Sequence, residues 1–265
     1  MENNGKLRIF RFVHCNKTTY NAHNGKSLID AAVAPKRQCV DKPSVIQVRL
    51  AEHICDLDEA KTTNDNYYGL FVWPSALLLS QFISTESRWL CRDKTILELG
   101  CGIGLPSILS GLCGAARIYL TDRIDASDIQ RNADTNIKLN GLEDRAQYLP
   151  LSWGDMHVSE EIISVFQTIQ VVLAADCFYQ SEEFEKVIAT VALILRCSAS
   201  LTCSFYFSYH LRSINRSIAF LLSRWKLIAQ SIDKNAYVND LIKIGDYPAK
   251  DFDSIYLYEV KRAIE

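Results

Sequence analysis

The most constraining feature of this sequence is a short apolar run that ends in alternating glycines, the segment TILELGCGIG at residues 95–104. A run of this kind suits a buried strand, and glycines directly after a strand let the backbone turn sharply and approach a ligand closely. In α/β folds, ligands bind outside the carboxyl ends of the strands. The segment therefore predicts a binding loop at one edge of a parallel sheet.

The spacing of the glycines separates this loop from two common nucleotide-binding motifs. A dinucleotide fingerprint would place its third glycine at position 105, but this chain has leucine there and carries its third glycine at 104. A carboxylate, Glu98, also precedes the first glycine. Because no Gly-Lys-Ser/Thr follows, a loop that cradles a triphosphate is excluded as well.

From residue 94 onward, β-rich runs alternate with segments of helical length, which is typical of a parallel sheet with helices on both faces. We expect a helix over 184–195 with Ser181 as its cap, a second helix over 125–140, and a third that starts at Trp73-Pro74, because proline suits the first helical turn. The predicted strands are 95–99, 117–121, 146–151, 169–175 and 200–207, and 226–232 and 254–260 would complete a seven-stranded sheet.

The chain is predicted to divide at residue 66. Residues 67–265 would form the α/β sheet domain, and 7–15 would pair with 45–50 as an amino-terminal β-ribbon. The polar segment 16–44 between these two runs has no clean periodicity, so we predict a mobile loop there.

Composition limits the class of protein further. Hydrophobic residues make up 48% and charged residues 23% of 265, which excludes a wholly disordered or fibrous chain. A net charge of −2 argues against nonspecific binding to nucleic acid. The uncharged stretches are shorter than the ~20 residues of a membrane span, and the amino terminus has no apolar signal core. Nine cysteines without a Cys-x-x-Cys pair predict neither disulfides nor a metal site. Because disulfides are typical of secreted proteins, we expect this protein to be located in the cytoplasm or nucleus.

The glycine motif, read as Glu-x-Gly-x-Gly-x-Gly, resembles the first motif of seven-stranded S-adenosylmethionine-dependent methyltransferases. Further segments stand where the methyltransferase-like (lysine methyltransferase) group of small protein methyltransferases has its signatures: YGLFVWP at 68–74, LSWG at 151–154 and AADCFY at 174–179. With FSYHLRS at 207–213, the likeness extends to a histone-arginine methyltransferase member of the group. The resemblance covers residues 67–225 and implies S-adenosyl-L-methionine as cofactor, with S-adenosyl-L-homocysteine as product, a Rossmann-like sheet and a protein substrate.

Two carboxylates belong to the expected binding loop. Asp122 ends the second strand, 20 residues after Gly102, where a carboxylate can accept both hydroxyls of a ribose, although an Asp there can also form a turn. Glu98 could meet the amino end of the ligand or orient the loop backbone. The cofactor contacts that the resemblance implies are Trp73, Gly100, Cys101, Gly102, Asp122, Trp153 and Ala175, and Glu98 is a further candidate from its own position.

Methyl transfer requires an acceptor held in line with the methyl group and relieved of a proton. We expect Asp176 and Tyr179, after the fourth strand, and Tyr209, from the fifth, to orient the acceptor, with Asp176 taking a guanidinium or ammonium hydrogen. Alternatively, Asp176 caps the helix that begins near Ser181 or ties the loop. His210 lacks a second ligand nearby and predicts no metal site.

The acceptor itself stays open at this stage. Arginine follows from the resemblance alone, because the chain has no equivalent of the paired-glutamate loop of the classical arginine methyltransferases; lysine and small-molecule acceptors remain alternatives. Asp-Cys-Phe-Tyr at 176–179 replaces the Asn-Pro-Pro-Tyr/Phe motif of amino-methyltransferases of adenine or glutamine. A module that binds cofactor and docks a partner without catalysis is the reading from another class. We expect a monomer whose partner is a protein, such as a histone or a chaperone-associated substrate, rather than nucleic acid or membrane.

Overall fold

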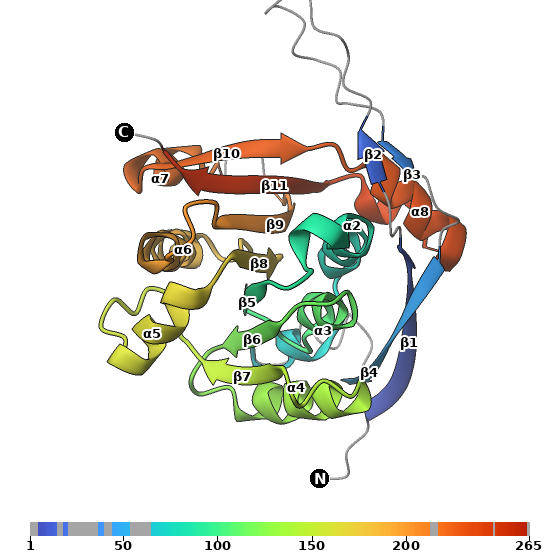
Figure 1. Cartoon of the computed structure of the whole chain (residues 1–265), viewed down its shortest axis with the longest axis horizontal. Coiled ribbons are helices and arrows are strands. Elements are labelled where there is room, and N and C mark those ends of the chain that lie inside the picture. Colours follow the sequence, from blue (N-terminus) through green and yellow to red (C-terminus); the bar gives the residue numbers. More distant parts are fainter. Residues whose placement is uncertain are drawn as a thin grey trace, which may run out of the picture.

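A seven-stranded mixed sheet forms the centre of the molecule (Figure 1). The computed structural model describes residues 5–14, 18–20, 37–39, 44–53, 65–212, 217–245 and 247–263. The strand order is β10-β11-β9-β8-β5-β6-β7, in which β11 runs antiparallel to both of its neighbours and β5 to β9 are parallel. The strands are β5 (Thr95–Leu99), β6 (Arg117–Asp122), β7 (Ala146–Pro150), β8 (Val171–Ala175), β9 (Ser204–His210), β10 (Leu227–Ile232) and β11 (Ile255–Arg262). The predicted seven-stranded fold class is thereby confirmed.

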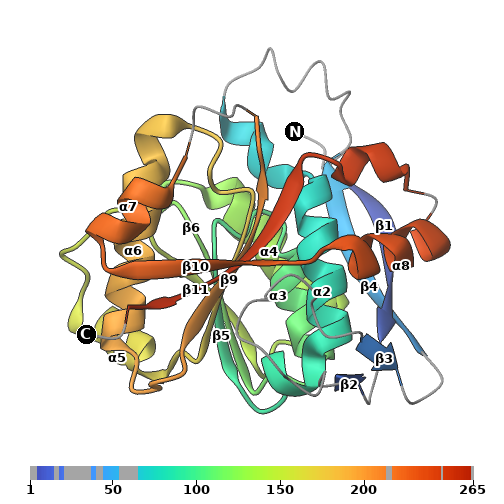
Figure 2. The same ribbon diagram turned by 90° about the horizontal axis from the view of Figure 1, so that it is seen from above.

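Helices cover both faces of this sheet, and an apolar core lies on each side (Figures 1 and 2). The helices α2 (Pro74–Leu90), α3 (Leu105–Leu112) and α4 (Ser127–Leu139) lie on one face, and α5 (Glu160–Thr168) and α6 (Phe184–Cys197) on the other. The remaining helices are α7 (Ala219–Arg224) near β10 and α8 (Asn235–Gly245) against α2. The 3-10 turns are η1 (Asp65–Leu70), η2 (Ser181–Glu183) and η3 (Ala249–Phe252). None of the helices in these ranges has the length and apolar character to cross a bilayer.

Two of the boundaries that differ from the sequence prediction do so for clear local reasons. β9 begins four residues later than expected because residues 200–203 form a turn, in which Cys203 N donates to the carbonyl of Ser200 at 3.1 Å. The 3-10 turn η2 precedes α6, so Glu183 rather than Ser181 is its N-cap, and no side chain caps the helix. The start of α2 is as predicted, with Trp73 extended (φ −82°, ψ 149°) before the first-turn proline.

The expected amino-terminal ribbon is present. β1 (Gly5–His14) and β4 (Ser44–His53) pair antiparallel along their whole length; β1 packs on α2 and α8, and β4 packs on α3 and α4. Most of the predicted loop 16–44 lies outside the described residues. Within it, β2 (Thr18–Tyr20) and β3 (Arg37–Cys39) pair antiparallel. The division at residue 66 stays a prediction.

A row of asparagines on α4 ties this ribbon to the rest of the fold. Asn136 Oδ1 accepts from Ala51 N at 2.7 Å, and Asn132 Nδ2 donates to the Ala51 carbonyl at 3.0 Å. Asn140 bonds the β4 backbone in the same way two residues earlier. Asn136 is fully buried, and its Nδ2 also donates to the carbonyl of Ile103 at 3.0 Å. One side chain thus bridges the ribbon and the glycine loop.

Candidate active site

A cavity of about 380 Å³ lies at the carboxyl ends of β5, β6 and β8. The segment before α2, the glycine loop and the ends of these three strands form its walls. We call it the carboxyl-edge cavity. It brings together ten of the eleven predicted site residues: Trp73, Glu98, Gly100, Cys101, Gly102, Asp122, Trp153, Ala175, Asp176 and Tyr179.

The glycine loop is closely surrounded, and its backbone is left-handed where it lines the cavity. Gly100 has a φ of 59° and Gly102 a φ of 52°. A Cβ on Gly100 would lie 2.7 Å from the Trp153 ring, and one on Gly102 would lie 2.8 Å from the carbonyl oxygen of Gly69. Both the φ values and these approaches require glycine, because any side chain would strain the backbone and close the space.

Glu98 is buried, and its side chain bonds to the start of the helix that follows the loop. Its Oε2 accepts a hydrogen bond from the backbone N–H of Ser107, in the first turn of α3, at 2.9 Å. Burial raises the pKa of Glu98 to about 8, and the bond from Ser107 opposes that rise. This contact orients backbone, as in one of the two expected roles, but it is made to α3 rather than to the glycine loop, and the role of Glu98 stays a prediction.

Asp122 ends β6, and its side chain holds the loop. Oδ2 accepts from Gly102 N at 3.0 Å and Oδ1 accepts from Arg123 N at 2.8 Å. Burial raises the pKa of the Asp122 carboxyl, and these two N–H donors counteract the rise. A carboxylate offers about four lone-pair sites, so two acceptor positions remain for hydroxyl groups in the cavity.

Two tryptophans stand in the cavity wall. Trp73 donates its ring N–H to the carbonyl of Tyr68 at 3.0 Å, and the two rings are 6.1 Å apart. Trp153 lies against Gly100, where a Cβ on the glycine would come within 2.7 Å of the indole ring. An indole face next to a glycine turn provides a flat apolar surface for a planar base.

Asp176 follows β8 in a left-handed conformation (φ 58°), unusual for a residue with a side chain. Its carboxylate binds Arg212, with Oδ1–Nη1 at 2.9 Å and Oδ2–Nη2 at 2.6 Å. Oδ1 also accepts from His210 N at 3.3 Å. These partners come from β9 and the residues after it, rather than from the turn near Ser181.

Arg212 lines the cavity and was missed as a site residue by sequence reasoning. A usable signal exists, because Ala175 pairs with Ser208 in neighbouring parallel strands. Residues just past the two strand ends therefore lie side by side, and an arginine there faces a carboxylate.

Tyr209 is the one predicted site residue that the structure leaves outside the cavity. Successive side chains of a strand point to opposite faces. Ser208 faces α2, where its hydroxyl donates to the Ser75 carbonyl at 2.8 Å, so Tyr209 faces the other core. Its ring is buried and stands edge-on to Phe178 at 5.9 Å.

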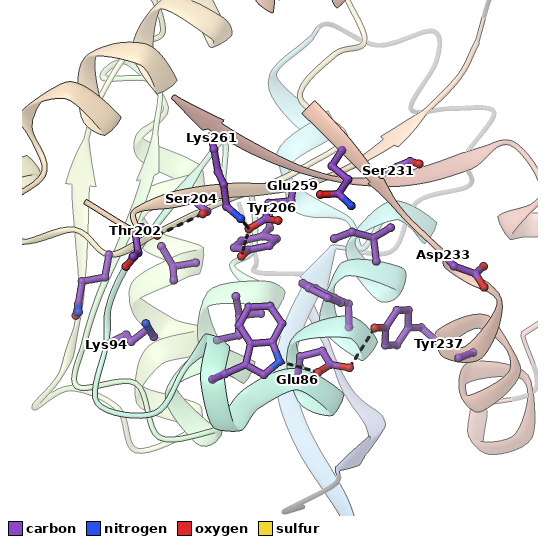
Figure 3. A pocket seen from close by; sticks show the side chains of 18 of the residues that line it. Glu86, Lys94, Thr202, Ser204, Tyr206, Ser231, Asp233, Tyr237, Glu259 and Lys261 are labelled. Carbon is purple, nitrogen blue, oxygen red and sulfur yellow. Dashed lines mark hydrogen bonds and ion pairs between the residues drawn. The ribbon is translucent and has the colours of Figure 1, made fainter. Parts of the chain in front are cut away.

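A larger cavity, of about 1070 Å³, lies at the amino ends of β8 and β9, between α2, β10, β11 and α8 (Figure 3). We call it the amino-edge cavity. Its polar groups bond to one another: Tyr206 donates to Glu259 at 2.6 Å, Tyr237 donates to Glu86 at 3.1 Å, and Lys261 pairs with Glu259 at 2.9 Å. None of the predicted site residues lines it.

The carboxyl-edge cavity fits a methionine-derived nucleoside. Its glycine cradle would be filled by any Cβ, a half-buried carboxylate with remaining acceptor capacity stands on the next strand, and an indole closes one side. Together with the strand order, this arrangement defines the class of seven-stranded S-adenosylmethionine-dependent methyltransferases.

Comparison with known proteins gives the same class. Residues 55–222 match the family described as "Lysine methyltransferase", and the chain belongs to this family. It is 30% identical over 173 residues to the histone-arginine methyltransferase METTL23 of Xenopus laevis, which covers 65% of this chain and 70% of that protein. It is 33% identical over 135 residues to the protein-lysine methyltransferase METTL21E of Mus musculus, covering 49% and 52%.

A solved structure has the same fold: SMU.776 in complex with SAH, with a TM-score of 0.50 and 11% identity, covering 82% of this chain and 53% of that chain. The protein is an enzyme, an S-adenosylmethionine-dependent methyltransferase, and the family resemblance seen in the sequence is confirmed.

Proposed function

We propose that this enzyme methylates arginine side chains of proteins, with histones as the first candidate substrates. Several relatives carry the name histone-arginine methyltransferase, among them METTL23 of Mus musculus, 31% identical over 179 residues. The observation that carries the proposal is that three carboxylates of the cavity wall bind different partners. Glu98 holds the first turn of α3 and Asp122 holds the glycine loop, whereas Asp176 holds a guanidinium.

The cofactor supplies a methyl group on a positively charged sulfur, which an acceptor takes by in-line displacement. We assign its ribose to Asp122, its adenine to the face of Trp153, and its exclusion from water to Trp73, with the backbone at Gly100 and Gly102 approaching it most closely. The glycine positions leave the room that such an approach needs.

An arginine acceptor is protonated at neutral pH, because its pKa is above ~12. We assign to Asp176 the task of orienting the guanidinium and accepting one of its hydrogens, since a carboxylate holds this planar group by two parallel bonds. Tyr179, 38% exposed and part of the cavity wall, would position the acceptor from the outer side.

Lysine is the second candidate acceptor. The family description names lysine, and METTL21E is a relative named for lysine methylation. An ammonium group could donate to the same carboxylate, although with one point of contact in place of two.

A labelled methyl donor, incubated with the purified enzyme and core histones, tests the proposal. Label recovered as methylarginine supports the proposal, and label on lysine would favour lysine, the second candidate acceptor. Label on metabolites alone would assign a small-molecule acceptor, and no label despite tight binding of S-adenosylhomocysteine would leave a docking module. An Asp176→Asn variant with full turnover would contradict the role given to Asp176.

We further propose that the enzyme acts as a monomer in the nucleus or cytoplasm on a histone or chaperone-associated protein. The names of the relatives support a protein substrate. Cell fractionation of the tagged protein and sedimentation of the purified chain test the two parts separately.

A further inference from the structure

The carboxylate of Asp176 already binds a guanidinium, that of Arg212 in the same chain. The two hydrogen bonds, at 2.9 and 2.6 Å, run side by side between the planar guanidinium and the planar carboxylate. Both side chains line the carboxyl-edge cavity, to which Tyr179 and Trp73 also contribute. A guanidinium therefore stands in the wall where the acceptor of the proposed reaction is expected.

The acidic member of this pair is fixed in place. Its side chain is 6% exposed, and its backbone N–H donates to the Ser208 carbonyl at 2.9 Å. The N–H of His210 holds Oδ1 from a second side. Asp176 is thus oriented by the sheet itself, independently of the group that binds it.

The basic member is held far less. Arg212 lies past the end of β9, and its side chain is 33% exposed. Within the described residues, its one further hydrogen bond is to the carbonyl of His210, at 3.4 Å. The larger exposure of Arg212 means that a group arriving from solvent meets the guanidinium before it meets the carboxylate.

We propose that Arg212 occupies the acceptor subsite as an internal stand-in, and that the guanidinium of a substrate arginine takes its place on Asp176. This inference rests on the proposed function. The carboxylate would make two hydrogen bonds to a guanidinium both before and after the exchange, so neither end state leaves it buried and unpaired, which is a costly state. A lysine ammonium, a point charge, would make one contact with Asp176 in place of two, so the exchange favours arginine.

The test is the affinity of a fluorescently labelled arginine peptide, with S-adenosylhomocysteine present, for the wild-type chain and for Arg212→Gln. Bound to Asp176 nine-tenths of the time, Arg212 would weaken peptide binding about tenfold. We therefore expect Arg212→Gln to tighten binding of the arginine peptide by about tenfold, and to change a matched lysine peptide less. Unchanged or weaker binding of the arginine peptide, in a variant that still binds S-adenosylhomocysteine, would overturn the inference.

Arg212→Gln leaves a buried carboxylate without its partner and could destabilise the chain, so two further measurements are needed. Arg212→Lys keeps the positive charge, and we expect it too to tighten binding of the arginine peptide. In Arg212→Gln, millimolar ethylguanidinium should raise the Tm more than ethylammonium does. The double variant Asp176→Asn/Arg212→Gln should respond to neither ion, and an equal response to both ions in Arg212→Gln would contradict a guanidinium subsite.

Failure of this inference differs from failure of the proposed function. Tighter arginine-peptide binding in Arg212→Gln, without methylation of any protein, would overturn the function and leave the subsite standing. Methylation of arginine by the wild-type chain, with peptide affinity unmoved in both Arg212 variants, would overturn the stand-in and leave the function standing.

Discussion

The two cavities at opposite edges of the sheet differ in backbone conformation and in how their polar groups are paired. The carboxyl-edge cavity is made of backbone in left-handed conformations, at Gly100, Gly102 and Asp176, around carboxylates that keep acceptor capacity. None of the described residues lining the amino-edge cavity has a positive φ, and its aromatic rings and carboxylates bond to one another. The smaller cavity is the one prepared for a ligand, because left-handed backbone that gives close access and remaining acceptors, rather than volume, indicate a binding site.

The largest expected effect comes from adding a methyl group to the glycine loop. Gly100→Ala places a Cβ 2.7 Å from Trp153 at a φ of 59°, so we expect affinity for S-adenosylhomocysteine, measured by calorimetry, to fall about 100-fold. Gly141→Ala is the matched control, since Gly141 has a φ of 64° and nothing within 4 Å of the added atom. It should lose about 1 kcal/mol of stability and no affinity. Equal losses of affinity in both variants would contradict the special status of the loop.

A smaller loss is expected from Asp122→Asn. The amide can accept at one end only, so one of the bonds from Gly102 and Arg123 is lost together with ribose acceptors, at about 2 kcal/mol of cofactor affinity. The control in the amino-edge cavity is Asp233→Asn, because Asp233 also accepts from a backbone N–H, that of Asn235, at 3.0 Å. Titration with S-adenosylhomocysteine should separate the two variants. The comparison fails if the Asp233 variant binds as poorly as the Asp122 variant.

The pH dependence of stability sharpens the comparison through Glu98. Burial raises the folded-state pKa of Glu98 to about 8 from its ordinary 4.5, so the folded chain binds a proton that the unfolded chain has released. Between these values, rising pH should lower the free energy of unfolding by at most ~1.4 kcal/mol per pH unit. Urea unfolding at several pH values should give a flatter profile for Glu98→Gln than for the wild-type chain. Parallel profiles would mean that Glu98 does not titrate in this way.

The smallest effect is expected in the amino-edge cavity. Tyr237→Phe removes the phenol that donates to the buried Glu86, while Trp89 continues to donate to it at 2.7 Å. We expect the free energy of unfolding to fall by about 1 kcal/mol and cofactor affinity to stay as it was. A matching loss of affinity for S-adenosylhomocysteine would couple the two cavities and break the distinction drawn between them.

Much of the fold could be predicted because its signals are local. The apolar run at 95–99, the glycines after it and the proline of Trp73-Pro74 each fix the backbone within a few residues, and all three were predicted correctly. Ser181 was wrongly expected to cap α6, because a cap depends on where the preceding turn ends, and η2 intervenes.

The orientation of Tyr209 could not be predicted for a different reason. β9 is buried on both faces, so its sequence shows no alternation of apolar and polar residues that would tell which face a given ring occupies. Arg212 and Asp176 are 36 residues apart in the chain, and their pairing depends on β8 and β9 being neighbours. The roles given to the site residues stay predictions until variants are measured.

The bridge made by Asn136 changes how the amino-terminal ribbon should be regarded. No described residue of β1 or β4 lines the carboxyl-edge cavity, yet removing the ribbon would take the Ala51 partner from a fully buried amide that also donates to Ile103 and Asn132. Strand pairing outside the cavity therefore helps to fix the backbone of the glycine loop, and a chain without the ribbon would lose this support at Ile103.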